Sequence, residues 1–141
     1  MTTDAQGVWS VTLGPIEPSL WIYNFTMDGI DLADPVNPQV KLRMRTSRSL
    51  LDVRGEKPNS WEIRDDIPHG AVGINWHNSQ VTDDTRSYYV YTPPGYDPAG
   101  AIRYPVLYLL HGNGVRLSDW TAAGRANFMA DSLIAAQKCS G

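Results

Sequence analysis

The sequence predicts two parts in succession: an incomplete β-sandwich over residues 1–68, then the start of an α/β domain over residues 69–141. Short strand-like runs separated by turn residues fill the first part, which is the pattern of a β-sandwich. The second part contains an apolar run at residues 104–110, typical of strands buried in parallel sheets. A helical stripe follows that run, so strand, loop and helix succeed one another as in an α/β fold.

The first part contains two runs with the alternation of strands. Residues 8–13 alternate, with Trp9, Val11 and Leu13 on one face and Ser10 and Thr12 on the other. Residues 19–27 do the same, and one face would carry four large side chains: Trp21, Tyr23, Phe25 and Met27. Asp28-Gly29 follows directly, which is a strong hairpin turn signal. Several proline-containing breakers then divide the remainder into short segments, as expected of a sandwich.

The second part begins with two expected strands, residues 71–79 and 86–92, joined by a polar turn at 81–85. Pro93-Pro94-Gly95 forms a rigid exit turn, since proline fixes φ and has no N–H. After the buried strand at 104–110, apolar side chains recur at helical spacing from Ala126, and the stripe comprises Ala126, Met129, Ala130, Leu133 and Ile134. Arg125, Asn127 and Asp131 lie mainly off this stripe.

The loop between strand and helix carries the first chemical hypothesis. Gly112, Asn113 and Gly114 follow the apolar run, and a glycine-bearing turn there brings backbone N–H groups close to an oxyanion. Taken alone, the motif fits a plain strand-to-helix turn as well. Ester hydrolysis also needs a serine, a histidine and a carboxylate, and no Gly-x-Ser-x-Gly occurs in the chain. Ser79, Ser118 and Ser132 lack the strained elbow that exposes a nucleophile, so we expect no catalytic residue here.

Three segments in order carry a resemblance to a known family. They are Arg86-Ser-Tyr-Tyr-Val-Tyr-Thr-Pro-Pro-Gly-Tyr-Asp97, Tyr104-Pro-Val-Leu-Tyr-Leu-Leu-His-Gly112, and Asp119-Trp120 with Gly124-Arg-Ala-Asn-Phe-Met-Ala-Asp-Ser-Leu-Ile134. Together they closely resemble the start of the α/β-hydrolase domain of carbohydrate esterase family 1, which includes feruloyl, acetylxylan and enterochelin esterases. The resemblance implies a serine carboxylic-ester hydrolase acting on feruloyl, acetyl or related esters of plant polysaccharide, and gives His111 a structural role.

The preceding residues resemble a second module. Residues 7–15, 23–29 and 34–38 are similar to the later strands of the immunoglobulin-like, glycogen-binding-module-like domain that precedes such esterases. Two departures qualify the match: Asn113 stands where family members commonly have glycine, and residues 137–141 do not resemble the family's continuation. The chain is therefore expected to be clipped at both ends and to have no triad-dependent turnover alone.

Composition limits which partners and cofactors the chain is expected to bind. A net charge of −3 provides no electrostatic case for nucleic acid or an anionic membrane. No apolar run approaches the roughly 18 residues of a membrane span. The single Cys139 excludes an internal disulfide and a cysteine-rich zinc site, and the three histidines lack metal-ligand spacing. We expect no metal and no cofactor; the N-terminus has no signal-peptide pattern, and the compartment stays open although the family is often secreted or periplasmic.

Two alternatives to an esterase stay open. Trp9, Trp21 and Trp61 are candidate carbohydrate contacts, with Tyr23 beside them, although the two-residue alternation favours a core position for Trp21 and Tyr23. The chain is alternatively an inactive associating fragment. The resemblance implies a later strand inserted between residues 86–92 and 104–110, and without it two unpaired edges would favour dimerisation.

The remaining polar candidates are expected to be structural. His69 follows Ile67-Pro68 and is predicted to be a turn residue, and His77 on its strand a surface or packing residue. Ser118 or Thr121 is expected to cap the entry of a helix. Asp83-Asp84 is predicted to be a solvated turn.

Overall fold

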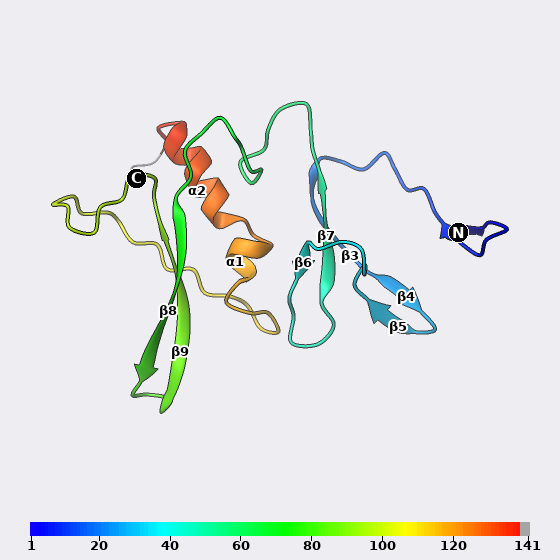
Figure 1. Ribbon diagram of the computed structural model, residues 1–141, viewed down its shortest axis with the longest axis horizontal. Helices are drawn as coiled ribbons and strands as arrows, with labels where there is room; N and C mark the ends of the chain where they lie inside the picture. The colour runs from blue at the N-terminus through cyan, green and yellow to red at the C-terminus, as the bar shows by residue number, and fades with distance from the viewer. Residues whose placement is uncertain (139–141) are drawn as a thin grey trace.

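Mostly β-structure, with two short helices near the C-terminus, is seen in the computed structural model, which describes residues 1–138 (Figure 1). The strands of these residues form four small sheets rather than one closed sandwich. The architecture is compatible with an incomplete β-sandwich. Cys139 and the last two residues lie outside the described part, so most of the 137–141 segment that departs from the family pattern is not described. No helix within residues 1–138 is long and apolar enough to cross a bilayer.

The N-terminal strand is much shorter than predicted. β1 (Thr2–Thr3) pairs antiparallel with β2 (Trp9–Ser10), and regular structure ends there instead of continuing to residue 13. Val11 and Leu13, which the alternation puts on one face with Trp9, are exposed. The alternation failed as a predictor because a strand also needs a neighbour for its N–H and C=O groups, and residues 11–18 pair with no strand.

The predicted long strand at residues 19–27 is divided at Asn24. β3 (Ser19–Tyr23) joins a three-stranded sheet with β7 (Arg48–Val53) and β6 (Val40–Lys41), in the order β3-β7-β6. β4 (Phe25–Met27) instead pairs with β5 (Ile30–Leu32) in a separate hairpin. The predicted turn is confirmed: Asp28 has φ 51° and Gly29 φ 80°, the positive pair of a type I′ turn.

A hydrogen-bonded turn holds the centre of the β3-β7-β6 sheet. The Tyr23 hydroxyl donates to Asp34 Oδ2 at 2.6 Å, and Asn37 Nδ2 donates both to the Tyr23 hydroxyl and to the Leu50 carbonyl. The Asp34 N–H donates to the buried hydroxyl of Ser49. The Tyr23 hydrogen bond lowers the pKa of the Asp34 carboxyl, and the same bond raises the pKa of Tyr23. This turn therefore packs back onto β3 and β7.

The hairpin that opens the second part is confirmed. β8 (Ala71–Ser79) pairs antiparallel with β9 (Asp84–Thr92), which begins at Asp84 instead of the expected Arg86. Asp83 takes a positive φ of 50° in the connecting turn. Asp84 is thus a strand residue, and it accepts hydrogen bonds from Thr82 and Arg86. His77 packs edge-on against Tyr88 across the hairpin, in agreement with its expected packing role.

The predicted buried strand at residues 104–110 is wrong for this structure. The segment has no regular secondary structure, and its apolar side chains lie in solvent, with Leu107 80% and Leu110 87% exposed. A parallel strand depends on hydrogen-bonding partners on its flanks. Neither β8 nor β9 pairs with this segment, so its apolar composition alone cannot hold it in a sheet.

The helix prediction is confirmed in position but not in orientation. α1 (Asp119–Ala122) precedes α2 (Ala126–Ala135). Ser118 occupies the position before α1 but makes no capping bond, and the Thr121 hydroxyl donates to the Ser118 carbonyl, so neither side chain is the predicted cap. Asp131 on α2 and Arg125 just before it, both off the stripe, are buried, whereas Leu133 on the apolar stripe is exposed.

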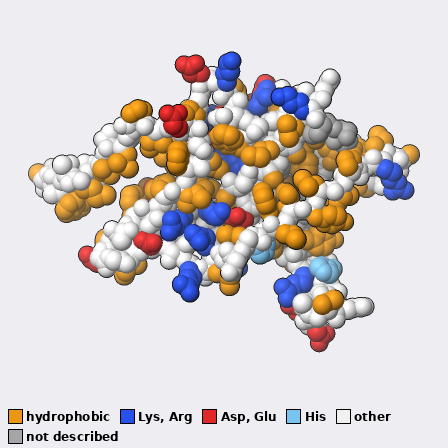
Figure 2. All heavy atoms as spheres, turned by 180° about the vertical axis from the view of Figure 1, so that it is seen from behind, with side chains coloured by type: hydrophobic (Ala, Val, Ile, Leu, Met, Phe, Trp, Pro, Cys, Tyr) orange, Lys and Arg blue, Asp and Glu red, His pale blue; other side chains and the backbone are white. Residues whose placement is uncertain are grey.

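Little of the apolar surface is buried. Leu50, 4% exposed, is the buried hydrophobic residue of the described chain, while the other buried side chains are polar. The accessible area is 11052 Å², against about 7,300 Å² for a compact monomer of this mass. Figure 2 shows hydrophobic side chains spread widely over one face. Polar contacts between elements therefore carry much of the tertiary organisation.

Candidate functional site

The predicted oxyanion loop docks against the β-rich part. The Met44 N–H donates to the Gly114 carbonyl at 3.1 Å, and an isolated antiparallel bridge joins Arg43 to Val115. Gly114 has φ 78°, a conformation that glycine adopts without steric cost. The loop between β6 and β7 thus fixes one side of residues 112–114.

The donors of this loop are free within the described chain. No protein acceptor within residues 1–138 receives the N–H of Gly112, Asn113 or Gly114. A Cβ built on Gly112 or Gly114 would meet nothing within 4 Å, so the approach to this backbone is open. Unpaired N–H groups with open access suit an incoming anionic oxygen.

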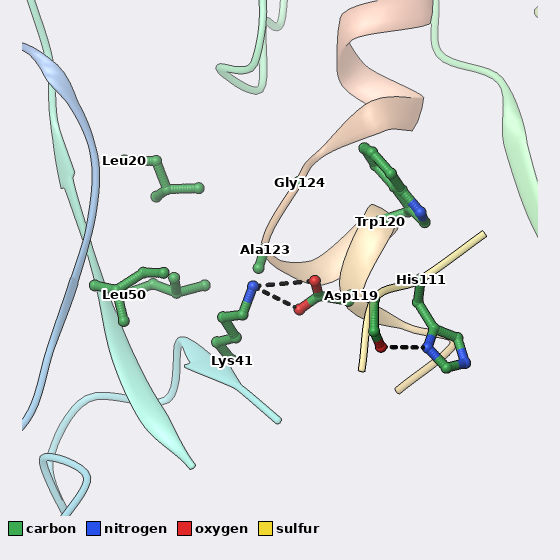
Figure 3. A pocket seen from close by; sticks show the side chains of 10 residues that line it. Leu20, Lys41, Leu50, His111, Asp119, Trp120, Ala123 and Gly124 are labelled. Carbon is green, nitrogen blue, oxygen red and sulfur yellow. Dashed lines mark hydrogen bonds and ion pairs between the residues drawn. The ribbon is translucent and has the colours of Figure 1, made fainter. Parts of the chain in front are cut away.

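A cavity of about 200 Å³ lies beside the loop, between the β3-β7-β6 sheet and α1. Lys41 extends from β6 into it and forms an ion pair with Asp119 of α1, with Nζ 2.9 Å from Oδ1 (Figure 3). His111 Nδ1 is 3.0 Å from the carbonyl oxygen of the neighbouring Gly112. Lys41 and Asp119 thus neutralise each other in this cavity. His111 has no serine partner among the described residues.

A second polar connection ties α2 to β7. The buried Arg125 guanidinium donates to Asp52 at 2.7 Å and to Gln39 Oε1 at 3.0 Å. Arg125 itself has φ 50° immediately before the helix. The sequence placed this arginine off the apolar stripe; in the structure it is buried and its ion pair with Asp52 joins the start of the helix to the sheet.

Asp131 of α2 is a buried carboxylate with three hydrogen-bonding partners, and its side chain is 1% exposed. Its Oδ1 accepts from the Gly70 N–H at 2.9 Å and from the Tyr91 hydroxyl at 2.7 Å. Its Oδ2 lies 2.8 Å from His69 Nδ1. One carboxylate of α2 thus binds the residue before β8 and a residue near the end of β9, at the open end of the hairpin.

His69 is more than the predicted turn residue. Its Nδ1 faces Asp131 and its Nε2 faces the Arg64 carbonyl at 2.8 Å, and both partners are acceptors. Only the protonated imidazole donates from both nitrogens, so these two bonds, Asp131 first, raise the pKa of His69. With both nitrogens occupied, His69 acts as a structural cation. No local signal announces it, because Asp131 lies 62 residues away in sequence.

The three candidate tryptophans lie on different elements. Trp9 is 67% exposed on the N-terminal hairpin, which extends to one end of the molecule (Figure 1). Trp21 on β3 is also exposed, contrary to its favoured core position, and its indole N–H donates to the Glu17 carbonyl at 2.9 Å. Trp61 lies in the loop after β7, half-buried. They form no continuous platform along one strand.

The other nucleophile and metal candidates stay unsupported in the described residues. The Ser132 hydroxyl is buried without a hydrogen-bond partner, and it does not contact a histidine. No group of three or more potential ligands among His, Cys, Asp and Glu in residues 1–138 has a metal-holding arrangement.

Comparison with known proteins adds a relative. No known family model matches the sequence. Over 136 residues the chain is 33% identical to an endo-1,4-beta-xylanase/feruloyl esterase of Xylanibacter ruminicola, an alignment that takes in 94% of this chain. It takes in 19% of that protein, so the chain spans about a fifth of the length of the curated relative it matches. The chain is thus related to one region of a carbohydrate-active enzyme.

Proposed function

We propose that this chain is the N-terminal part of a serine carboxylic-ester hydrolase acting on feruloyl, acetyl or related esters of plant polysaccharide. An immunoglobulin-like part over residues 1–68 would precede the start of an α/β-hydrolase domain over residues 69–141. The observation that carries the proposal is the 33% identity, over nearly the whole chain, to a protein named as a xylanase and feruloyl esterase.

The geometry of residues 112–114 supports this chemistry. During ester hydrolysis a serine oxygen adds to the carbonyl carbon, and the carbonyl oxygen becomes an oxyanion that backbone N–H groups stabilise. The free donors of Gly112, Asn113 and Gly114 would supply that stabilisation, and one such donor is worth about 3–4 kcal/mol of barrier. The nucleophile, general base and orienting acid would come from polypeptide beyond these 141 residues, whose sequence contains no Gly-x-Ser-x-Gly.

The exposed segment at residues 104–110 supports the same proposal. A run of apolar side chains with unpaired backbone suits the interior of a parallel sheet once strands flank it. Strands from the remainder of a hydrolase domain would provide that setting, and would bury the apolar stripe of α2 as well.

Hydrolysis of p-nitrophenyl acetate tests the proposal at the level of activity. The 141-residue chain alone is expected to give no turnover that a serine-directed fluorophosphonate inhibits, and no labelled serine. A longer protein that includes the downstream coding sequence is expected to hydrolyse methyl ferulate and to be labelled. Labelled, inhibitable activity in the short chain contradicts its inactivity; absence of a serine elbow in every downstream reading frame contradicts the esterase proposal.

Carbohydrate binding is a second candidate, and the exposure of Trp21 favours it. An indole ring exposed on β3 and oriented by its hydrogen bond to Glu17 can stack on a sugar. Affinity electrophoresis on xylan and on starch is the test, with Trp21→Ala as the variant and Trp76→Ala, an exposed tryptophan outside the candidate set, as the matched control. Unretarded migration of the unmodified chain rules the module out; retardation lost only in Trp21→Ala supports it.

A further inference from the structure

A groove beside the predicted oxyanion loop has a composition unlike the rest of the molecule. It has a volume of about 640 Å³, within the range of about 300–1,000 Å³ typical of ligand sites. Its lining includes Arg43, Arg45, Arg48, Asp31, Asn113 and Gly114. Figure 2 shows Lys and Arg side chains gathered over the loop between β6 and β7, which forms one wall. We call this feature the arginine groove.

The arginine groove is positively charged, although the chain as a whole is negatively charged. Three arginines face one aspartate there, a local excess of positive charge in a protein of net charge −3. Arg48 lies 4.0 Å from Asp31, at the outer limit of an ion pair, and Asp31 also accepts the Thr26 hydroxyl at 2.8 Å. The Asp31 carboxylate therefore already has Thr26 and Arg48 as partners.

The guanidinium groups of Arg43 and Arg45 make no hydrogen bond or ion pair within residues 1–138, and both residues are exposed. The backbone around them is nonetheless held, because Arg43 bridges Val115 and Met44 donates to Gly114. Two unpaired guanidinium groups on a fixed backbone present forked N–H donors, the geometry that pairs with a planar carboxylate. The Asn113 side chain adds an amide, which suits a neighbouring sugar hydroxyl.

We infer that the arginine groove binds the carboxylate of a uronic acid unit carried by a polysaccharide. The choice of a saccharide rests on the proposed function, whereas the choice of a carboxylate rests on the arginines. Asn113 and Gly114 line the groove and also belong to the predicted oxyanion loop. A bound uronic acid would therefore lie next to the ester-binding position. The groove would thereby select esters on acidic, uronate-substituted chains over neutral ones.

Isothermal titration of the 141-residue chain at low salt tests the inference with three ligands. They are a xylo-oligosaccharide with one glucuronic acid side group, a neutral xylo-oligosaccharide of the same backbone length, and inorganic phosphate. The acidic oligosaccharide is expected to bind about tenfold more tightly than the neutral one. Of the two oligosaccharides, only the acidic one should lose affinity when salt is added. Equal affinity for the two oligosaccharides, or no binding, overturns the inference; phosphate binding as tight as the acidic sugar shows a general anion site and overturns the uronate assignment.

Variants at Arg45 locate the site. Arg45→Ala is expected to weaken acidic-sugar binding about three- to tenfold. Arg45→Lys keeps the charge but loses the fork, so it should restore only part of the affinity. Arg103→Ala removes another exposed arginine, one outside the groove, and should leave the affinity unchanged. Equal losses in Arg45→Ala and Arg103→Ala, or full affinity in Arg45→Lys, contradict the assignment. Circular dichroism checks folding, and no ester hydrolysis enters the readout, so failure here leaves the esterase proposal standing.

Discussion

Individual buried polar residues hold this protein together more than apolar ones do. Asp131 accepts from Gly70 and Tyr91 and faces His69, and Arg125 joins Asp52 and Gln39. Such groups are costly to bury unless each is paired, which is why removing one partner is more damaging than replacing the whole set. The effects of substitution at these positions should therefore be large and should differ sharply between neighbours.

Asp131 and Ser132 provide the sharpest contrast. Asp131→Ala takes the same acceptor from the half-buried Gly70 N–H, the Tyr91 hydroxyl and His69, and should lower the free energy of unfolding by about 2–4 kcal/mol. Ser132→Ala removes a buried hydroxyl that has no partner, so it should be neutral within about 1 kcal/mol or stabilising. Urea unfolding followed by tryptophan fluorescence measures both, and equal effects would contradict the role of Asp131.

His69 should make stability depend on pH. Its pKa is raised in the folded chain by Asp131 and the Arg64 carbonyl, so its contribution is fully present below the unfolded value of about 6.5 and is lost as pH rises through the folded pKa. Unfolding midpoints of the unmodified chain and of His69→Gln, taken from about pH 6 to about pH 9, should converge as pH rises. A difference independent of pH would show that His69 is neutral in the fold.

Secondary-structure elements form here where local chemistry and a pairing partner coincide. The β4–β5 and β8–β9 hairpins have both, since Asp28-Gly29 and Asp83 supply the positive φ angles of their turns. Residues 104–110 have strand composition but no partner, and they stay irregular. Element stability should therefore follow pairing and turn geometry more than side-chain composition.

Gly29 tests the turn of the β4–β5 hairpin. At φ 80° an added Cβ is strained even though no atom lies within 4 Å of it. Gly29→Ala should cost about 1–2 kcal/mol of unfolding free energy. Gly112→Ala is the matched control, because that position also has open space but no positive φ. A loss in Gly112→Ala as large as in Gly29→Ala would mean that φ is not the cause.

Hydrogen exchange tests the contrast between residues 104–110 and the β8–β9 hairpin. In dilute, monomeric protein the amides of 104–110 should exchange rapidly because they have no ladder partner, whereas interior amides of β8 and β9 should be protected. Protection of 104–110 in the isolated chain would reveal pairing with another molecule or segment.

The whole molecule has more surface than a compact chain of its mass, and much of that excess is apolar. Exposed apolar segments and open strand edges favour association. We therefore predict that light scattering detects species larger than a monomer, in line with the dimer expected from the sequence. A single monomeric species at high concentration would contradict this.

A charge placed in the exposed segment identifies its role in that association. Leu107→Lys should shift the population towards monomer, because a charge opposes burial of the segment. Val81→Lys adds the same charge at another highly exposed apolar position, in the turn between β8 and β9, and should leave association unchanged. Equal shifts in both variants would point to net charge rather than to residues 104–110.

Local patterns predicted much of the secondary structure, since alternation, turn residues and helical spacing located β3, the two hairpins and α2. The first half of the candidate site was also foreseeable: Gly112, Asn113 and Gly114 were found from their glycines and the preceding apolar run. Their function as oxyanion donors stays a prediction, as does the division into two parts near residue 68.

Tertiary structure alone decided which faces are buried and which distant residues meet. The apolar stripe of α2 predicts a buried face, yet the buried residues are Asp131 and Ser132, off the stripe, and Arg125, just before the helix. Arg125 and Asp131 are buried there because β7 and the β8–β9 hairpin supply their partners. The groove formed by Arg43 and Arg45 against Gly114 likewise depends on a contact between segments far apart in sequence. The residue pattern of a segment indicates which secondary structure it can form. The neighbours that pack against the segment determine which of its faces is buried.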